Sequence, residues 1–237
     1  MKLKNIDSVL AVIPAKKTST RLPSKNLKLF NGFPLIYYSI QFAIHEGIKN
    51  IVVSSDCDQI ISYSKSLGVD TIKRPSELAT DQASTISVLK HATEHFISKK
   101  FKIDMVVTLQ PTNPLRKKNL LKNCFLKFKK HNYDSLMSVG LNKKKIGVLD
   151  DDQCYKPINY KIGTRSQDLN NSFYENGLIY ISHARNILEN DLLGNKIGTY
   201  ICDEISSSVD IDEMEDFMLG QYLFKEYSNL YGYLLKN

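Results

Sequence analysis

The sequence predicts an α/β protein of three layers, in which a mostly parallel sheet is covered by helices on both faces. Short apolar or β-branched runs alternate with segments of helical spacing along the first 140 residues, a pattern typical of strand–helix–strand units. Glycines stand at the expected ends of the first two helices, where a residue with positive φ commonly stops a helix. With 237 residues, of which 42% are hydrophobic, the chain can form one large domain with a real core.

The amino-terminal segment supplies the first of these units. An apolar run, Ser8 to Ile13, predicts a buried strand and leads into a loop rich in Lys, Arg, Ser and Thr. A turn at 30–34 precedes a helix over 35–46, which Gly47 ends. The next expected elements are a strand over 49–55, a helix over 56–67 and a short strand over 69–72.

Two further loops come next to expected strands. In the loop at 74–85, Pro75 blocks an early helix, and Asp81 or Ser84 can cap the helix that runs on to Phe96. The strand over 103–109 is almost wholly apolar, so we expect it to be central in the sheet. It continues into residues 110–116, where two prolines hold the loop open.

The chain changes in character after residue 140. A helix over 117–130 and a strand over 134–139 still follow the earlier pattern, but residues 143–158 predict a hairpin with an acidic turn. A two-stranded excursion cannot bury itself alone, so we expect residues 140–172 to need a partner surface. Strands over 173–181 and 196–202 and a helix over 213–227 complete the predicted elements.

Composition narrows the class of protein. The formal charge of +7 and the pI near 9.0 favour anionic partners, but lysines are spread along the whole chain without a nucleic-acid-binding motif, so no nucleic acid is expected. The cysteines are widely spaced and form no metal-ligand pattern, which is typical of reduced thiols in a cytoplasmic protein. Neither a signal peptide nor a membrane-spanning segment is expected. The four cysteines are Cys57, Cys124, Cys154 and Cys202.

Two segments carry residues suited to phosphate chemistry. Four cations stand on the loop after the first strand, where ligands of open α/β sheets bind, and they suit a polyphosphate. Near the carboxyl terminus, Asp210 and Asp212 are two apart on an extended segment, so their carboxylates point to one side and suit Mg²⁺ bound with substrate phosphates. Alternatively, Asp212 caps the following helix and Glu215 completes a capping box. The four cations are Lys16, Lys17, Arg21 and Lys25.

The spacing of five motifs, in order along residues 8–225, resembles the sugar-activating cytidylyltransferases. The closest likeness is to the CMP-sialic acid (N-acylneuraminate) synthetases and their relatives for other nonulosonic acids, such as legionaminic and pseudaminic acid. The chain departs from the family pattern at Lys16, where the family has Arg, and at Thr18, where many members have Gly. The motifs are Pro14-Ala15-Lys16-x-x-Ser19-x-Arg21-Leu22-Pro23-x-Lys25-Asn26, the segment Arg74 to Thr85, Leu109-Gln110-Pro111-Thr112-x-Pro114-Leu115-Arg116, Asn176-Gly177-x-Ile179-Tyr180, and Asp210-x-Asp212.

The resemblance implies a fold and a reaction. The fold is a Rossmann-like, mostly parallel sheet of the nucleotide-diphospho-sugar transferase type, with residues 1–237 as one cytidylyltransferase domain. Residues 140–172 would be an inserted β-hairpin element for dimerisation that reaches over the partner's active site, so a homodimer is expected. The reaction joins CTP and a nine-carbon 2-keto sugar acid to give the CMP-sugar and pyrophosphate, with Mg²⁺ as cofactor.

The resemblance also implies roles for single residues. The phosphates of CTP would be held by Lys16, Ser19, Arg21 and Lys25, and the nucleoside by Asn26, Arg74 and Thr85. The sugar acid would be held by Gln110, Lys145, Arg165, Asn176 and Tyr180. Asp210 and Asp212 would bind the metal and, with Lys25 and Arg21, act in catalysis. Because the five histidines fall on expected helices or their ends, metal activation or one of these Asp carboxylates would serve as base.

Alternatives stay open for several of these assignments. Arg74 could be an exposed residue at a capped helix start, the loop at 110–116 could be a rigid crossover, and Tyr180 could be a core residue. For the whole protein, one alternative is a synthetase for a shorter sugar acid such as Kdo, and the other is a non-catalytic nucleotide-binding module. Sialic, legionaminic and pseudaminic acids differ in stereochemistry and N-acyl groups, so a few pocket residues should decide among them.

Overall fold

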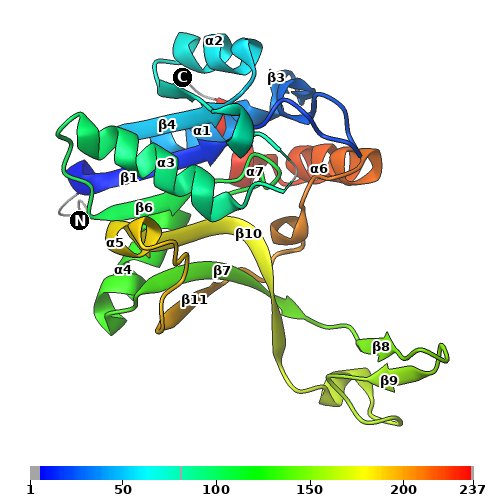
Figure 1. Ribbon diagram of the computed structural model, residues 1–237. Helices are drawn as coiled ribbons and strands as arrows, with labels where there is room; N and C mark the ends of the chain where they lie inside the picture. Colours follow the sequence, from blue (N-terminus) through cyan, green and yellow to red (C-terminus); the bar gives the residue numbers. More distant parts are fainter. Residues whose placement is uncertain (1–5, 81, 236–237) are drawn as a thin grey trace.

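A seven-stranded sheet forms the centre of the computed structural model, which describes residues 6–80 and 82–235 (Figure 1). The strand order is β11-β7-β10-β6-β1-β4-β5, and only β10 runs antiparallel to its neighbours. The predicted α/β class and mostly parallel sheet are therefore confirmed. The strands are β1 Val9–Pro14, β4 Asn50–Ser55, β5 Asp70–Lys73, β6 Met105–Thr108, β7 Ser135–Asn142, β10 Ser172–His183 and β11 Ile197–Ile201.

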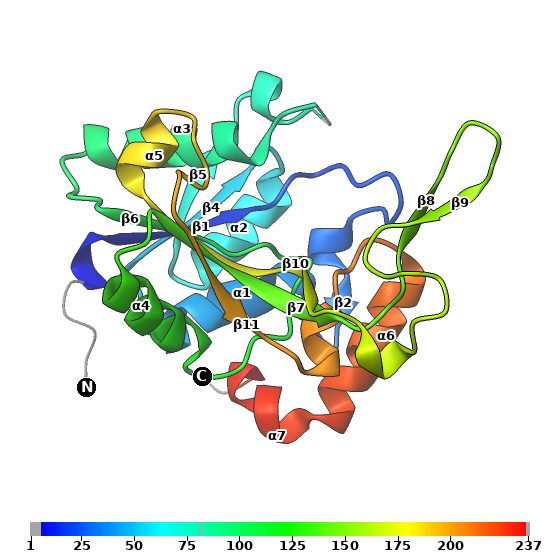
Figure 2. The same ribbon diagram turned by 90° about the horizontal axis from the view of Figure 1, so that it is seen from below.

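Helices cover both faces of this sheet (Figure 2). On one face, α3 and α5 pack against the even-numbered residues of β1, Leu10 and Val12. The other face carries α1 and α4, and Val9, Ala11 and Ile13 point into that larger core. Because β1 is buried on both faces, its sequence is apolar without alternation. The helices are α1 Leu35–His45, α2 Asp58–Ser66, α3 Thr85–Ser98, α4 Leu120–His131, α5 Ala184–Leu188, α6 Met214–Glu226 and α7 Ser228–Tyr231.

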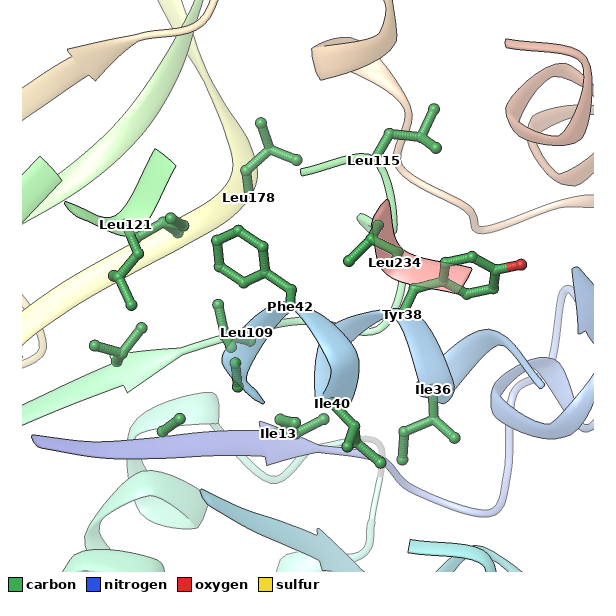
Figure 3. Packing of buried hydrophobic residues seen from close by; sticks show 14 of the residues in the cluster. Ile13, Ile36, Tyr38, Ile40, Phe42, Leu109, Leu115, Leu121, Leu178 and Leu234 are labelled. Atoms are coloured by element: carbon green, nitrogen blue, oxygen red, sulfur yellow. The ribbon is translucent and has the colours of Figure 1, made fainter. Parts of the chain in front are cut away.

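The helix α1 lies inside the larger core rather than on its surface. All its residues from Leu35 to Ala43 are buried, as expected for a helix that is apolar on most of its circumference. Figure 3 shows Ile40 on the side of α1 that faces Ile13 of β1, whereas Phe42 points to the opposite side, toward Leu178 of β10. The helix therefore packs against two strands of the sheet, β1 and β10.

The sheet register brings two loops to one edge. Pro14, the last residue of β1, pairs with Ser54 of β4, and Val12 pairs with Thr108 of β6. The chain leaves β1 and β6 at the same end of the sheet, and β4 and β6 lie on opposite sides of β1. Such a switch in strand order opens a crevice at the carboxyl ends of the strands, where ligands bind in this class of fold.

An arm of residues 143–171 projects from the extended ends of β7 and β10 (Figure 1). It carries the predicted hairpin, formed by β8 Gly147–Leu149 and β9 Tyr155–Pro157 with the acidic turn between them. A second small hairpin, β2 Leu29–Phe30 with β3 Phe33–Pro34, occupies the turn expected before α1. Large apolar side chains of the arm are exposed, among them Leu149, Ile158 and Ile162.

The helix caps agree with the sequence in one case and differ in another. The hydroxyl of Ser84 caps α3 by accepting from Ser87 N at 3.3 Å, whereas Asp81, the other candidate, lies outside the described residues. At α6, the capping box is formed by Glu213 and Asp216. The prediction that Asp212 caps this helix with Glu215 is therefore wrong, because the helix starts one residue later and Asp212 turns toward cations.

No helix within residues 6–80 and 82–235 is long and apolar enough to cross a membrane. All four cysteines lie within the described ranges and are free thiols, of which Cys154 is exposed.

Candidate active site

A cavity of about 430 Å³ lies at the edge where the chain leaves β1 and β6. Three segments meet there: the basic loop (residues 15–28), the proline loop (residues 110–116) and the Asp-x-Asp segment (residues 209–213). The N-terminus of α3 closes another side. The cavity is lined by most of the residues for which the sequence predicted a role: Lys16, Ser19, Arg21, Lys25, Asn26, Arg74, Thr85, Gln110, Asp210 and Asp212.

The basic loop is tied to the Asp-x-Asp segment by two cations. Lys25 Nζ donates to the carbonyl of Ile211 at 2.7 Å and to Asp212 Oδ1 at 2.8 Å. Arg21 donates to the other carboxylate oxygen, Asp212 Oδ2, at 2.5 Å. Lys25 is buried, but Arg21 is mostly exposed and can therefore move toward a ligand at low cost.

The loop is also closed on itself. Asn26 is buried and donates from Nδ2 to the carbonyl of Lys16 at 2.9 Å, so it joins the two ends of the basic segment. Ser24, just before it, has a φ of +54°, which turns the chain sharply into the short helix that carries Lys25. The resemblance implies a role for Asn26 at the nucleoside, and in the structure its amide donates to a backbone carbonyl at the cavity wall.

The two aspartates differ in their electrostatic surroundings. Burial raises the pKa of Asp210, the nearby charge of Asp212 adds to this, and a hydrogen bond from Thr112 opposes it. Burial also opposes ionisation of Asp212, but the hydrogen bonds and charges of Lys25 and Arg21 outweigh it and hold the pKa of Asp212 below its ordinary value. Lys25 and Arg21 already neutralise Asp212, so a cation bound beside Asp210 would stabilise the ionised forms of both carboxylates.

The donor set fits a hard divalent cation held jointly with a substrate. Within residues 6–80 and 82–235, no group of three or more His, Cys, Asp and Glu could hold a metal. The protein thus offers two carboxylates, Asp210 and Asp212, on one cavity wall. Mg²⁺ commonly takes one or two carboxylates and completes its octahedron with substrate phosphates and water.

A further wall of the cavity is built around Arg74. Its guanidinium is buried and donates to the carbonyl of Ser54 at 2.8 Å, to Ser54 Oγ at 3.3 Å and to the carbonyl of Leu78 at 3.5 Å. Burial lowers the pKa of Arg74. The alternative of an exposed arginine at a helix start is therefore wrong. Thr85, the first residue of α3, lines the same wall at the helix N-terminus, which favours negative charge.

The proline loop is held by Arg116, a residue to which the sequence analysis gave no role. Its guanidinium is fully buried and donates to the carbonyls of Leu178 and Gln110 and to Ser39 Oγ, at 2.7 to 3.0 Å. It also lies over the ring of Phe42, 5.5 Å from the centroid. Arg116 thereby fixes the backbone of Gln110, whose side chain lines the cavity.

Four residues assigned to the sugar acid do not line this cavity. Lys145 and Arg165 belong to the arm, where Lys145 lies over the ring of Tyr160 and Arg165 pairs with Asp168 at 2.6 Å. Asn176 is buried and accepts from Ser138 Oγ at 2.6 Å. Neither arm residue is part of the lining of this cavity, and Asn176 serves the packing of β10.

Tyr180 occupies an intermediate position. It is half-buried on β10, and its hydroxyl donates to Glu175 Oε2 at 3.0 Å. Burial raises the pKa of Tyr180, and the charges of Glu175 and Asp210 add to this effect. The tyrosine is thus neither a pure core residue nor part of the cavity wall, but it lies near the aspartate.

Four threonines in the cavity lining were given no role by the sequence analysis. Thr18, Thr20, Thr80 and Thr112 add hydroxyl groups there. Threonines are common in loops, and only their place within the motif segments could have singled them out.

Comparison with known proteins gives a consistent result. A family model described as cytidylyltransferase matches residues 10–231. The chain is 31% identical over 229 residues to a pseudaminic acid cytidylyltransferase of Campylobacter jejuni, covering 91% of this chain and 96% of that protein. It is 32% identical to a CMP-N,N'-diacetyllegionaminic acid synthase of Legionella pneumophila, covering 92% and 96% of the two chains.

Two further relatives extend the comparison. An N-acylneuraminate cytidylyltransferase of Streptococcus agalactiae is 31% identical over 92% of this chain, which spans 54% of that longer protein. Among solved structures, a CMP:2-keto-3-deoxy-manno-octonic acid synthetase complexed with CTP superposes with a TM-score of 0.69 at 16% identity, covering 92% of this chain and 99% of that one. At 16% identity, the likeness to this solved structure shows a shared fold alone.

Proposed function

The chain belongs to the cytidylyltransferase family, and from this membership we propose that its substrates are CTP and a nine-carbon 2-keto sugar acid. The products are the CMP-sugar and pyrophosphate. The observation that carries the proposal is the meeting of three segments in one cavity: the basic loop, the proline loop with Gln110, and the carboxylates of Asp210 and Asp212. Cations suited to a triphosphate thus face the two oxygen ligands that a divalent metal needs.

The reaction follows from the charges in this cavity. The anomeric 2-hydroxyl of the sugar acid attacks the α-phosphorus of CTP, the bond to the bridging oxygen breaks, and pyrophosphate leaves in line. Lys16, Lys25 and Arg21 stabilise the negative charge that develops on the leaving group. Arg21 has the freedom for this role because its side chain is 58% exposed.

Asp210 and Asp212 would hold Mg²⁺. When bound, this cation supplies charge neutralisation at the phosphate oxygens and a lower pKa for an attacking hydroxyl. No histidine lines the cavity among the described residues. Proton removal therefore falls to a carboxylate or to solvent.

The remaining roles follow the position of each residue. Ser19 donates to the phosphates, and Asn26, Arg74 and Thr85 shape the wall that takes the nucleoside. Gln110 presents its amide to the sugar acid from the end of β6. Tyr180 and Asn176 act from β10, the tyrosine as a neighbour of the sugar and the asparagine through packing.

A homodimer completes this account. The arm exposes apolar side chains that its own chain leaves uncovered, including Ile158 and Ile162, which are 64% and 81% exposed. Burying such a surface against a second copy would remove it from water. In the dimer, the arm brings Lys145 and Arg165 to the partner's cavity, where they bind the carboxylate of the sugar acid or the phosphates.

Pyrophosphate release with Mg²⁺, CTP and a panel of sugar acids tests the proposal. The panel contains sialic, legionaminic, pseudaminic and Kdo acids, since the relatives act on different nine-carbon acids and the fold also matches a CMP-Kdo-type synthetase. We expect turnover with one nine-carbon acid. Turnover with Kdo alone would select the shorter substrate. Binding of CTP without release from any acid would instead indicate a non-catalytic nucleotide-binding module.

A further inference from the structure

Asn113 lies in the proline loop, between two segments far from it in sequence. Its side chain is fully buried. Nδ2 donates to the carbonyl of Asn176 on β10 at 2.9 Å and to the carbonyl of Val209 at 3.1 Å. The Thr112 hydroxyl, which also contacts Asp210, lies 3.1 Å from Oδ1. One amide group therefore joins the proline loop, β10 and the Asp-x-Asp segment.

These contacts fix the backbone on both sides of Asp210. The carbonyl of Val209 belongs to the peptide group that contains Asp210 N, and Asn113 holds it. The next peptide group contains Ile211 N, which donates to the carbonyl of Thr112 at 2.8 Å. A residue has only two soft backbone dihedrals. Holding both flanking peptide groups therefore sets the direction in which the Cα–Cβ bond of Asp210 leaves the backbone.

The chain makes room for this amide at Gly177. A Cβ built on Gly177 would lie 2.6 Å from Asn113 Oδ1, and the residue has a φ of +71°. Only glycine adopts that conformation without strain and leaves that space. The Asn-Gly pair at 176–177 thus serves Asn113 twice, through the carbonyl of Asn176 and through the missing side chain of Gly177.

We propose that Asn113 is a positioning residue that aims the carboxylate of Asp210 at the metal in the cavity. The proposal rests on the proposed function, in which Asp210 is a metal ligand. An asparagine suits the place because its single nitrogen has two protons for two carbonyls, whereas an aspartate has none and would add a negative charge beside Asp210. Groups behind a metal ligand commonly change metal affinity by about 10- to 100-fold when removed.

Binding of Mn²⁺ in the presence of CTP, followed by electron paramagnetic resonance, tests this without measuring turnover. The variants are Asn113→Ala, the isosteric Asn113→Asp, and Asn113→Ser, which keeps one donor and is the least disruptive. Ser182→Ala is the matched control. Like Asn113, Ser182 is a buried polar residue, but its hydroxyl donates to the carbonyl of Leu192, which does not line the cavity. The variant Asp210→Asn tests whether the Asp210 carboxylate is itself a metal ligand.

We expect Mn²⁺ affinity to fall about 10- to 100-fold in the alanine and aspartate variants, less in the serine variant, and not in Ser182→Ala. Excess Mg²⁺ should restore turnover in folded Asn113→Ser, because the defect is in metal affinity. Parent-like Mn²⁺ affinity in the folded fraction of the Asn113 variants would overturn the inference while leaving the metal assignment intact. Equal Mn²⁺ binding by the parent and Asp210→Asn would overturn the metal assignment and the inference with it.

Discussion

Lys25 and Asp212, 187 residues apart in sequence, are joined by a hydrogen bond of 2.8 Å from Nζ to Oδ1. The same ammonium donates to the carbonyl of Ile211, so two of its three donors hold the Asp-x-Asp segment. The third is left for a ligand in the cavity. In the proposed function, Lys25 thereby couples the binding site of the triphosphate to that of the metal, and this coupling suggests the first test.

Lys25→Met should remove both functions of this ammonium. We expect kcat/KM for CTP to fall on the order of 10²–10³-fold, the usual cost of losing one donor to a developing negative charge. Stability should fall by about 1–3 kcal/mol, because Ile211 and Asp212 lose a buried partner. Lys28→Met is the control, since Lys28 Nζ lies over the ring of Phe217 and not at the cavity. Similar losses of kcat/KM in both variants would contradict the assignment.

Asp210→Asn should stabilise the free protein at neutral pH while it abolishes turnover. The folded-state pKa of Asp210 is raised above the ordinary value of 3.8 by burial and by Asp212. The favourable contribution of Asp210 to the free energy of unfolding is therefore present below pH 3.8, and it is lost as the pH rises through the raised pKa. Above that range the ionised carboxylate costs stability, which the amide avoids.

Thermal melting with and without Mg²⁺–CTP measures both effects. Without ligand, we expect a higher Tm for Asp210→Asn at pH 7 and a difference that disappears below pH 3.8. With ligand, only the parent should gain stability, and turnover of the variant should fall on the order of 10²–10⁴-fold, since a bound metal supplies several kcal/mol in such reactions. A lower Tm for the variant at pH 7 is incompatible with this electrostatic account.

Arg116→Met should destabilise the protein strongly. The guanidinium is fully buried, and its removal takes a donor from the carbonyls of Leu178 and Gln110. The carbonyl of Gln110 keeps Asn113 N and Ser39 Oγ as donors. Because an orphaned buried acceptor costs about 1–3 kcal/mol and the packing of the long side chain is also lost, urea unfolding should show a loss of about 2 kcal/mol or more. A loss below about 1 kcal/mol would mean that the carbonyls find other partners.

If the arm forms the proposed homodimer, Ile162→Glu should convert the protein to a monomer, because it replaces an apolar side chain of the arm that is 81% exposed with a charge. Analytical ultracentrifugation measures the change directly, and sugar-acid turnover should fall with it if Lys145 and Arg165 act in the partner's cavity. Leu126→Glu, on the exposed side of α4, is the control and should stay dimeric. A parent protein that sediments as a monomer at micromolar concentration contradicts the arm's proposed role.

Much of the cavity could be anticipated because its residues follow strands. Lys16, Gln110 and Asp210 come from separate loops, yet parallel strands that end at one edge bring such loops together. The resemblance added the spacing within each loop. The boundaries of strands and helices also agree closely with the apolar runs of the sequence. This agreement is expected because a strand or helix that is buried on one or both faces needs apolar residues there.

The sequence could not indicate the buried polar contacts. Asn113 and Arg116 stand within a recognised motif, but their partners lie on β10 and before Asp210, which only the folded chain reveals. The capping box at α6 was missed for a related reason. Several acidic residues surround Met214, and local spacing alone does not choose the pair Glu213 and Asp216. Asp212 is turned away from the helix by Lys25, a tertiary contact.

The measurement that tests the central claim most directly follows CTP by phosphorus NMR, with Mg²⁺ and the sugar acid that releases pyrophosphate. The account predicts that the parent forms pyrophosphate and a CMP-sugar phosphodiester in equal amounts, and that Asp210→Asn forms neither. Free CMP in place of the phosphodiester, or undiminished product with Asp210→Asn, would contradict transfer of the CMP unit to a sugar acid at this cavity.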